Sequence, residues 1–181
     1  IRKDSTGWIW GSPMSTFPMS VITNAKFVDA GAMMCSFVKH DGTVWSVGTN
    51  NNSIFGNDTF SSLSTTQPRQ AVNVNNAVRV AVSRANLGIL LSDGTVMTTG
   101  SNTYGGLGTG ASGSTIARRP VLVPKLKKIV DIKGTAYNLA ALDSFGNVYT
   151  WGSATSIGNG SNNMQDTPVR VSSISDIVAI S

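Results

Sequence analysis

The feature that most constrains the fold of this chain is an internal repeat. The tetrapeptide Asp41-Gly42-Thr43-Val44 recurs 52 positions later as Asp93-Gly94-Thr95-Val96. The same offset relates Gly48 to Gly100 and Gly100 to Gly152. A fixed period sustained over three units is the signature of a repeat architecture, in which each unit packs against its neighbours.

Each unit has the local chemistry of strands joined by tight turns. The Asp-Gly pairs favour two-residue hairpins because glycine accepts a positive φ and aspartate tolerates it, and apolar and β-branched runs flank them. A unit of four strands is the content of one propeller blade. In the first full unit the strands are predicted at the following ranges: Phe27–Ala30, Cys35–Lys39, Thr43–Val47 and Gln70–Val74.

A glycine-punctuated segment, Gly100 to Gly108, follows the third strand of the second unit, and Gly106 is one of its glycines. A proline and a further strand come downstream in each unit, at Pro68, Pro120 and Pro168. This arrangement resembles the repeat of the regulator of chromosome condensation family, which implies an all-β fold, a β-propeller of four-stranded antiparallel blades. The family usually carries glutamine where this chain has Gly106.

The repeats diverge from that family in other ways. The histidine common in the family's second strand is replaced by Met34, Asn86 and Asn138. The third unit is also shorter, with 16 residues from its signature glycine to its proline where the first two units have 20. Function therefore transfers poorly from the family to this chain.

About three and a half repeats are present. We place a partial blade at 1–25, blades at 26–76, 77–128 and 129–175, and the start of a further repeat at 176–181. Rings usually contain roughly four to eight blades, and the family's ring has seven. Three arrangements remain open: a segment of a larger ring completed by further repeats or other chains, two copies that meet, or ends that join in a four-blade ring. We favour the first.

The polar composition argues against an enzyme. All nine acidic residues are aspartate, and the single histidine, His40, directly precedes a turn. No nucleophile, base and orienting group can be assembled from these residues, and no paired histidine or Cys-x-x-Cys provides a metal site. One cysteine, Cys35, excludes an internal disulfide. We therefore predict no catalytic residues, no bound metal and no cofactor.

A basic cluster and one tyrosine are the candidate partner-binding residues. The chain has a net charge of +5, but only 13% of its residues are charged, so we do not expect it to bind nucleic acid. No apolar stretch is long enough for membrane insertion. The candidate contacts are Tyr104, Arg118, Arg119, Lys125, Lys127 and Lys128, with Lys133 in the same basic segment.

The variable segments rich in Ser, Thr, Asn and Gly are predicted to be the partner-binding loops. They cover residues 50–67, 103–119 and 154–166. The tryptophans before the signature glycine are predicted to pack between blades; they are Trp8, Trp10, Trp45 and Trp151.

The leading functional hypothesis is a non-enzymatic binding or structural module that contacts a protein or glycan through its loops. The Ser/Thr/Asn/Gly-rich composition without glutamate suggests an extracellular or virion-surface protein, such as a phage tail or adhesin component, with a cytoplasmic or nuclear protein as the alternative. The family resemblance implies two further hypotheses: guanine-nucleotide exchange on a small GTPase, and enzyme inhibition by propeller loops.

Overall fold

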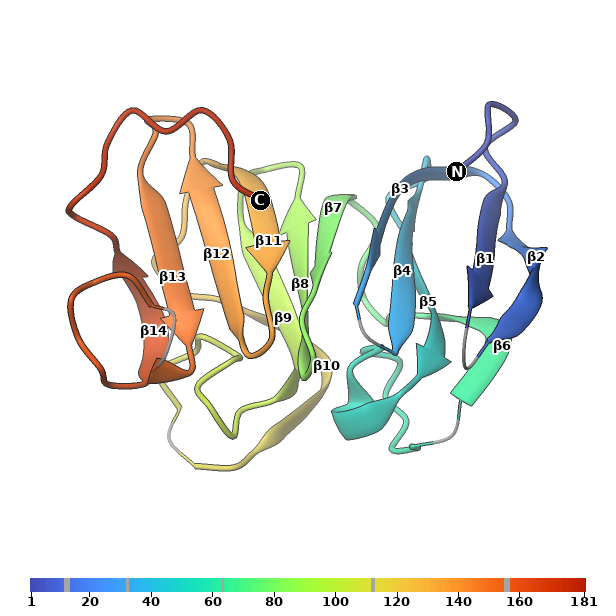
Figure 1. The fold of residues 1–181 in the computed structure, drawn as a ribbon, viewed down its shortest axis with the longest axis horizontal. Helices are drawn as coiled ribbons and strands as arrows, with labels where there is room; N and C mark the ends of the chain where they lie inside the picture. Colours follow the sequence, from blue (N-terminus) through green and yellow to red (C-terminus); the bar gives the residue numbers. More distant parts are fainter. Residues whose placement is uncertain (12–13, 32, 63, 112, 155–156) are drawn as a thin grey trace.

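Four antiparallel sheets follow one another along the chain. The computed structural model describes residues 1–181 except 12–13, 32, 63, 112 and 155–156. Three sheets have four strands in sequence order and the first has two. Figure 1 shows them side by side in an open arc, with the two-stranded sheet at one end and the β11–β14 sheet at the other. This is part of a β-propeller, as the sequence predicts.

The strand bounds reproduce the repeat period. The two-stranded sheet consists of β1 (Gly7–Gly11) and β2 (Ser15–Ile22). The second sheet consists of β3 (Ala25–Ala30), β4 (Met34–Lys39), β5 (Val44–Thr49) and β6 (Ser64–Gln70). The third consists of β7 (Ala77–Val82), β8 (Asn86–Leu91), β9 (Val96–Ser101) and β10 (Ile116–Leu122). The fourth consists of β11 (Ile129–Gly134), β12 (Asn138–Asp143), β13 (Val148–Gly152) and β14 (Gln165–Arg170).

The predicted Asp-Gly turns join the second and third strands in the second and third sheets. In the second sheet, Asp41 Oδ1 accepts the backbone N–H of Thr43 at 2.9 Å and its hydroxyl at 2.6 Å, while Gly42 has a φ of 78°. Asp93 and Thr95 repeat both bonds at the same distances. An aspartate that caps its own turn in this way fixes the hairpin register.

The partial first unit has the same local chemistry. Thr6 donates to Asp4 from its backbone N–H and its hydroxyl, and Trp8 Nε1 donates to Thr6 Oγ1 at 2.8 Å. Trp45 Nε1 donates to Thr43 Oγ1 at 2.9 Å in the next blade. The β1–β2 sheet therefore corresponds to the third and fourth strands of a blade.

The fourth strand of the first full blade is displaced from its predicted position. We expected Gln70–Val74, but β6 covers Ser64–Gln70 and the chain then turns at Asn73, whose φ is 58°. Pro68 lies inside the strand, not before it. A proline without an N–H is tolerated there because β6 is an edge strand whose pairing with β5 is interrupted between Thr65 and Arg69. The predicted loops shorten accordingly, because β10 and β14 also begin before their prolines.

The hydrophobic core lies between neighbouring blades. Separate clusters of buried side chains fill the spaces on either side of the β3–β6 sheet, and another lies between the β7–β10 and β11–β14 sheets. Phe37, Leu87 and Trp151 are almost fully buried in them. A fourth cluster packs Ile177 and Ile180 of the C-terminal segment against Leu142, at the far end of the arc.

The tryptophans do not all pack as expected. Trp151 is fully buried and Trp8 and Trp45 are half-buried, but Trp10 is 67% exposed, so the prediction that it packs between blades is wrong. Trp10 follows the buried Ile9 in β1, and successive residues of a strand face opposite sides. In a strand of consecutive apolar and aromatic residues such as β1, only every second side chain therefore faces the core.

Candidate binding face

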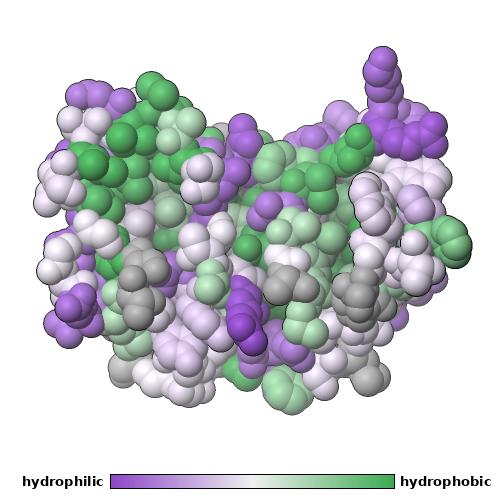
Figure 2. Space-filling model, in the orientation of Figure 1, coloured by the Kyte–Doolittle hydropathy of each residue, from purple (hydrophilic) through white to green (hydrophobic). Residues whose placement is uncertain are grey.

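The long loops that connect the third and fourth strands of the three full blades extend from one side of the arc. They follow β5, β9 and β13 and lie along the lower edge of Figure 1. Residues 63, 112 and 155–156 of the predicted loops lie outside the described residues. Figure 2 shows that this side is mostly pale or hydrophilic, whereas strongly hydrophobic residues gather higher up, over the β11–β14 sheet and the C-terminal segment.

A buried asparagine holds each of the first two loops in shape. Asn50 Oδ1 accepts the backbone N–H of Phe55 at 2.9 Å, and its amide nitrogen donates to the carbonyl of Thr59 at 3.5 Å. In the next blade, Asn102 Oδ1 accepts the N–H of Leu107 at 3.3 Å and its amide nitrogen donates to Ala111 O at 2.7 Å. Satisfied polar networks of this kind rigidify buried backbone.

Each of these loops is also bonded to the third strand of the following blade. Thr99 Oγ1 in β9 donates to the carbonyl of Ile54 at 2.5 Å. Trp151 Nε1 in β13 donates to the carbonyl of Gly106 at 3.2 Å. Thr99 and Trp151 are 52 positions apart, so the two contacts are equivalent.

A second bond joins each loop to the fourth strand of the following blade. The backbone N–H of Asp58 donates to Arg118 O at 2.9 Å, and that of Gly110 donates to Asp166 O at 2.8 Å. Arg119 adds an ion pair with Asp58, whose carboxyl pKa is held below its usual value by the hydrogen bond from Arg119. The loops after β5 and β9 are therefore braced by the next blade.

The third loop has a different construction. Ala154 stands where Asn50 and Asn102 stand in the other two blades, and the unit is four residues shorter. Its described part keeps one equivalent contact, because Thr150 Oγ1 donates to Ile157 O as Thr98 Oγ1 donates to Leu107 O. The two asparagine-anchored loops are thus the better-defined part of this face.

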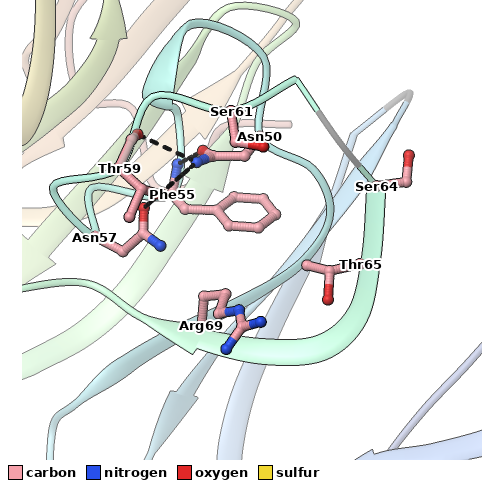
Figure 3. A pocket seen from close by; sticks show the side chains of 8 residues that line it. All are labelled: Asn50, Phe55, Asn57, Thr59, Ser61, Ser64, Thr65 and Arg69. Atoms are coloured by element: carbon pink, nitrogen blue, oxygen red, sulfur yellow. Dashed lines mark hydrogen bonds between the residues drawn. The ribbon is translucent and has the colours of Figure 1, made fainter.

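A pocket of about 560 Å³ opens under the first loop (Figure 3). The Phe55 ring lies at its base, and the guanidinium of Arg69 on β6 lies beside it. The other lining residues carry hydroxyl or amide groups: Asn50, Asn57, Thr59, Ser61, Ser64 and Thr65. None is acidic. Ligand sites commonly have this volume.

The predicted partner-binding residues do not form one cluster. Arg118 and Arg119 lie in the middle of β10 and contact the loop after β5, where Arg118 lies over the Phe60 ring at 5.6 Å and Arg119 pairs with Asp58. Lys125, Lys127 and Lys128 lie beyond the other end of β10, beside the hairpin turns: Gly94 approaches the backbone of Lys128, whose Nζ lies 4.6 Å from the Phe145 ring centre. The second half of β10 and the residues that follow it separate the two groups.

Tyr104 lies on the loop face, which is the side of the arc formed by the loops after β5, β9 and β13, and it packs against a second aromatic ring. Its ring centre lies 4.8 Å from that of Tyr137, in the turn between β11 and β12, and the Arg84 guanidinium lies 5.7 Å from the Tyr137 ring. Tyr104 is 44% exposed and Phe60 is 66% exposed. Sequence reasoning singled out Tyr104 but missed Tyr137, Arg84 and Phe60. Tyr137 is 52 positions after Ala85. Only a comparison of the repeats therefore shows that an aromatic residue stands where the preceding blade has alanine.

The groups that catalysis or metal binding would use lie apart. His40 is exposed and its Nε2 lies 3.5 Å from Ser5 Oγ. Burial, followed by the charge of Asp29, raises the pKa of the Cys35 thiol. Among the described residues, no three His, Cys, Asp or Glu side chains gather in a way that could hold a metal ion. Over the same residues, no helix is long and apolar enough to cross a membrane.

Solved structures with the same arrangement of sheets identify the architecture. The structure of Prp20p from Saccharomyces cerevisiae, described with its binding to Gsp1p and histones, aligns with a TM-score of 0.71 at 18% identity, over 85% of this chain and 40% of that one. The chain has the fold of an RCC1-type propeller. Human WBSCR16 aligns with a TM-score of 0.75 at 19% identity, over 86% of this chain and 43% of that one.

A second structure of yeast RCC1 (Prp20), bound to Kap60, gives a TM-score of 0.71 at 17% identity, over 85% of this chain and 38% of that one. The propeller segment described here therefore spans about two fifths of the length of these structures. No protein-family model matches the chain. At these identities the similarity concerns the fold, and the role of the loops must be interpreted from this chain's own residues.

Proposed function

We propose that the chain is a non-enzymatic binding module that contacts a partner through its loop face. The observation that carries this proposal is that two loops are fixed in shape by Asn50 and Asn102, braced by the next blade, and carry the exposed rings of Phe60 and Tyr104. Rigid aromatic side chains next to arginine are the composition of binding hot spots, because they bury a large area at a low entropic cost.

The chemistry of the remaining residues supports a binding role over catalysis. His40 is exposed at a turn. Asp41 and Asp93, whose carboxyl pKa values are lowered, cap hairpins by accepting bonds from Thr43 and Thr95. These carboxylates are occupied by structural hydrogen bonds. A propeller that only binds a partner does not need a catalytic nucleophile or base.

The decisive experiment is site-specific photo-crosslinking in the source of the protein. A benzophenone side chain replaces Tyr104 on the loop face, and a matched chain carries it at Phe145, which is 65% exposed beside the opposite turns. We expect one dominant crosslinked protein or glycoprotein from position 104 and not from position 145. Identical products from both positions, or none from position 104, would overturn the proposal.

A regulator of a small GTPase is the second candidate function. It is favoured by the similarity to Prp20p, which is described with its binding to Gsp1p. The direct test is release of a fluorescent guanine nucleotide from purified Gsp1p with and without this chain. A catalytic increase in release rate would replace the first proposal with this one, and an unchanged rate is the result that we expect.

We also propose a wider context for the chain. The chain spans about two fifths of the similar structures and its sheets form an open arc, which supports completion of the ring by further repeats or other chains. Placement in an extracellular or virion-surface assembly, such as a phage tail or adhesin, rests on composition alone. Light scattering tests the assembly: a stable monomer of 18.9 kDa would contradict completion of the ring by other chains.

A further inference from the structure

The pocket under the first loop opens where β6 separates from β5. Pairing between β5 and β6 is interrupted between Arg69 and Thr65, so β6 bulges away from the sheet and leaves a space beneath residues 50–61. Figure 3 shows the side chains of the loop and of β6 on either side of this space, with the Phe55 ring between them. The ring is only 1% exposed and serves as a floor.

Arg69 is the one charged group in the lining of the pocket, and it has no ion-pair partner among the residues that the structure describes. The ion pairs found among the described residues join Arg79 to Asp131 and Arg119 to Asp58, and neither involves Arg69. Asp58 belongs to the same loop, but its carboxylate is bonded to Arg119 of the next blade. A guanidinium in a recess without an acidic neighbour is a site for a carboxylate or other oxyanion, which it can bind in a bidentate manner.

The neutral groups around Arg69 add directional hydrogen bonding. Asn57 Oδ1 accepts bonds from Thr59 Oγ1 at 2.8 Å and from the Asn50 amide at 3.4 Å. Those two bonds fix the orientation of the amide, and its nitrogen is left to donate to a ligand. The two β6 hydroxyls of the lining are already bonded within the chain: Thr65 Oγ1 donates to Gln67 O at 3.2 Å and accepts the Gln67 N–H, and Ser64 Oγ lies 2.6 Å from Thr49 Oγ1. Each oxygen keeps a lone pair that can accept a hydrogen bond, so this lining suits a ligand that carries hydroxyl donors.

The next blade provides an internal comparison. Displacement by 52 positions takes the anchors Asn50 and Phe55 to Asn102 and Leu107, which make the same loop-forming bond. The pocket residues Asn57, Thr59, Ser61, Ser64, Thr65 and Arg69 correspond to Thr109, Ala111, Gly113, Ile116, Ala117 and Val121. The fold therefore retains the anchors without requiring the arginine or most of the hydroxyls, and the presence of Arg69 in the first pocket is not explained by folding.

We infer that this pocket binds a sugar acid, a polyhydroxylated ring that carries one carboxylate, such as a hexuronate unit. Arg69 holds the carboxylate, and the hydroxyls and the Asn57 amide bond the ring. A single cation matches a single negative charge better than it matches a phosphate or a sulfate cluster. An acidic peptide fits less well, because the buried Phe55 ring offers no apolar recess for its side chains. This inference is independent of the partner of Tyr104.

The test is an NMR titration of the isotopically labelled chain with D-glucuronate, up to about 20 mM in chloride buffer, a range that reveals a Kd in the low millimolar range. We expect saturable shifts at the amides of Thr65 and Arg69, and none at the equivalent Ala117 and Val121. Glucose, which lacks the carboxylate, should give at least tenfold weaker binding, because the charge-assisted bond is lost.

Matched variants assign the effect to the pocket. Arg69→Val installs the residue of the next blade at an exposed strand position, and it should weaken glucuronate binding at least tenfold. Thr65→Ala, also the residue of the next blade, should weaken it severalfold. Arg170→Gln removes a different exposed arginine from an edge strand and should leave binding unchanged.

Three outcomes would overturn the inference. One is the absence of a saturable shift at Thr65 and Arg69, and another is equal binding of glucose and glucuronate. The third is stronger binding of an acetylated Glu-containing tripeptide than of glucuronate, which would make the pocket a peptide site. Failure here leaves the crosslinking result at position 104 unaffected, so the two proposals fail separately.

Discussion

Trp151 Nε1 donates a hydrogen bond across the blade boundary to the carbonyl of Gly106, and the indole ring is fully buried. Gly108 packs directly on the same ring, with a φ of 68°. One side chain therefore fills the core between two blades and holds the glycine-rich loop in place. Trp151 therefore contributes both to the core and to the shape of the loop that Asn102 anchors.

Trp151→Phe should lower the free energy of unfolding by about 2–4 kcal/mol, because it leaves a cavity and an unpaired carbonyl at Gly106. Urea denaturation provides the measurement. Trp10→Phe is the matched control: Trp10 is 67% exposed, and its replacement should change the unfolding free energy by less than about 0.5 kcal/mol. Equal effects of the two substitutions would refute the role given to Trp151.

Asn102→Ala should release the second loop. The substitution leaves the N–H of Leu107 buried without its acceptor, which costs about 1–3 kcal/mol. Hydrogen exchange should accelerate at Leu107 far more than in β8. Asn162→Ala, at an exposed position of the third loop, is the control and should leave exchange at Leu107 unchanged.

Gly100→Ala tests the close approach of blade strands at the signature glycine. Gly100 has a φ of 105°, and a Cβ there would collide with the carbonyl of Ala85. We expect a loss of about 2–4 kcal/mol in thermal or urea unfolding. At Gly113 the φ is 87° but nothing lies within 4 Å of the added carbon, so Gly113→Ala should cost only about 1–2 kcal/mol of backbone strain.

Asp143 should make stability depend on acid pH. Burial raises the pKa of this carboxyl, but bonds from the Asn147 side chain, the Asn147 backbone and the Phe145 backbone outweigh it and hold the pKa below its usual value of 3.8. The stabilisation is therefore present above the unfolded-state pKa and is lost as pH falls through the lower folded-state value.

Asp143→Asn should accordingly destabilise the chain most at neutral pH, and the difference from the unsubstituted chain should shrink as the pH falls from 5 toward the folded-state pKa. Urea midpoints measured across this range test the prediction. A difference that stays constant, or grows on acidification, would mean that the carboxylate is not stabilised in the folded state.

The sequence predicts the blades well because their determinants are local and periodic. The Asp41 and Asp93 turns are recognisable from a dipeptide, and Asp4 and Trp8 of the partial first blade make the same hydrogen bonds as Asp41 and Trp45. The fourth strand was placed wrongly because Pro68 was interpreted as preceding the strand. Its position inside β6 depends on which strand forms the edge of the sheet, and that is a tertiary property.

The candidate site was harder to predict. Arg118 and Lys128 are ten positions apart in sequence, but the strand between them carries them to opposite sides of the propeller. In the sequence, Arg69 has no feature that separates it from other cations beside loops. In the structure, the bulge of β6 places it beside Phe55. The signal that could have revealed it is the contrast between Arg69 and Val121 at equivalent positions of two repeats.

The bracing of each loop by the next blade sets an order of events during synthesis. The loop around Asp58 gains its partners only when Thr99, Arg118 and Arg119 have been made, about 45 to 60 residues later. At roughly 5–20 residues per second, several seconds separate the emergence of the loop from the arrival of its support. A ribosome pause between β6 and β10 would prolong the interval in which the sugar-acid pocket is still unformed, so codon choice in that stretch bears on how soon a nascent chain can bind.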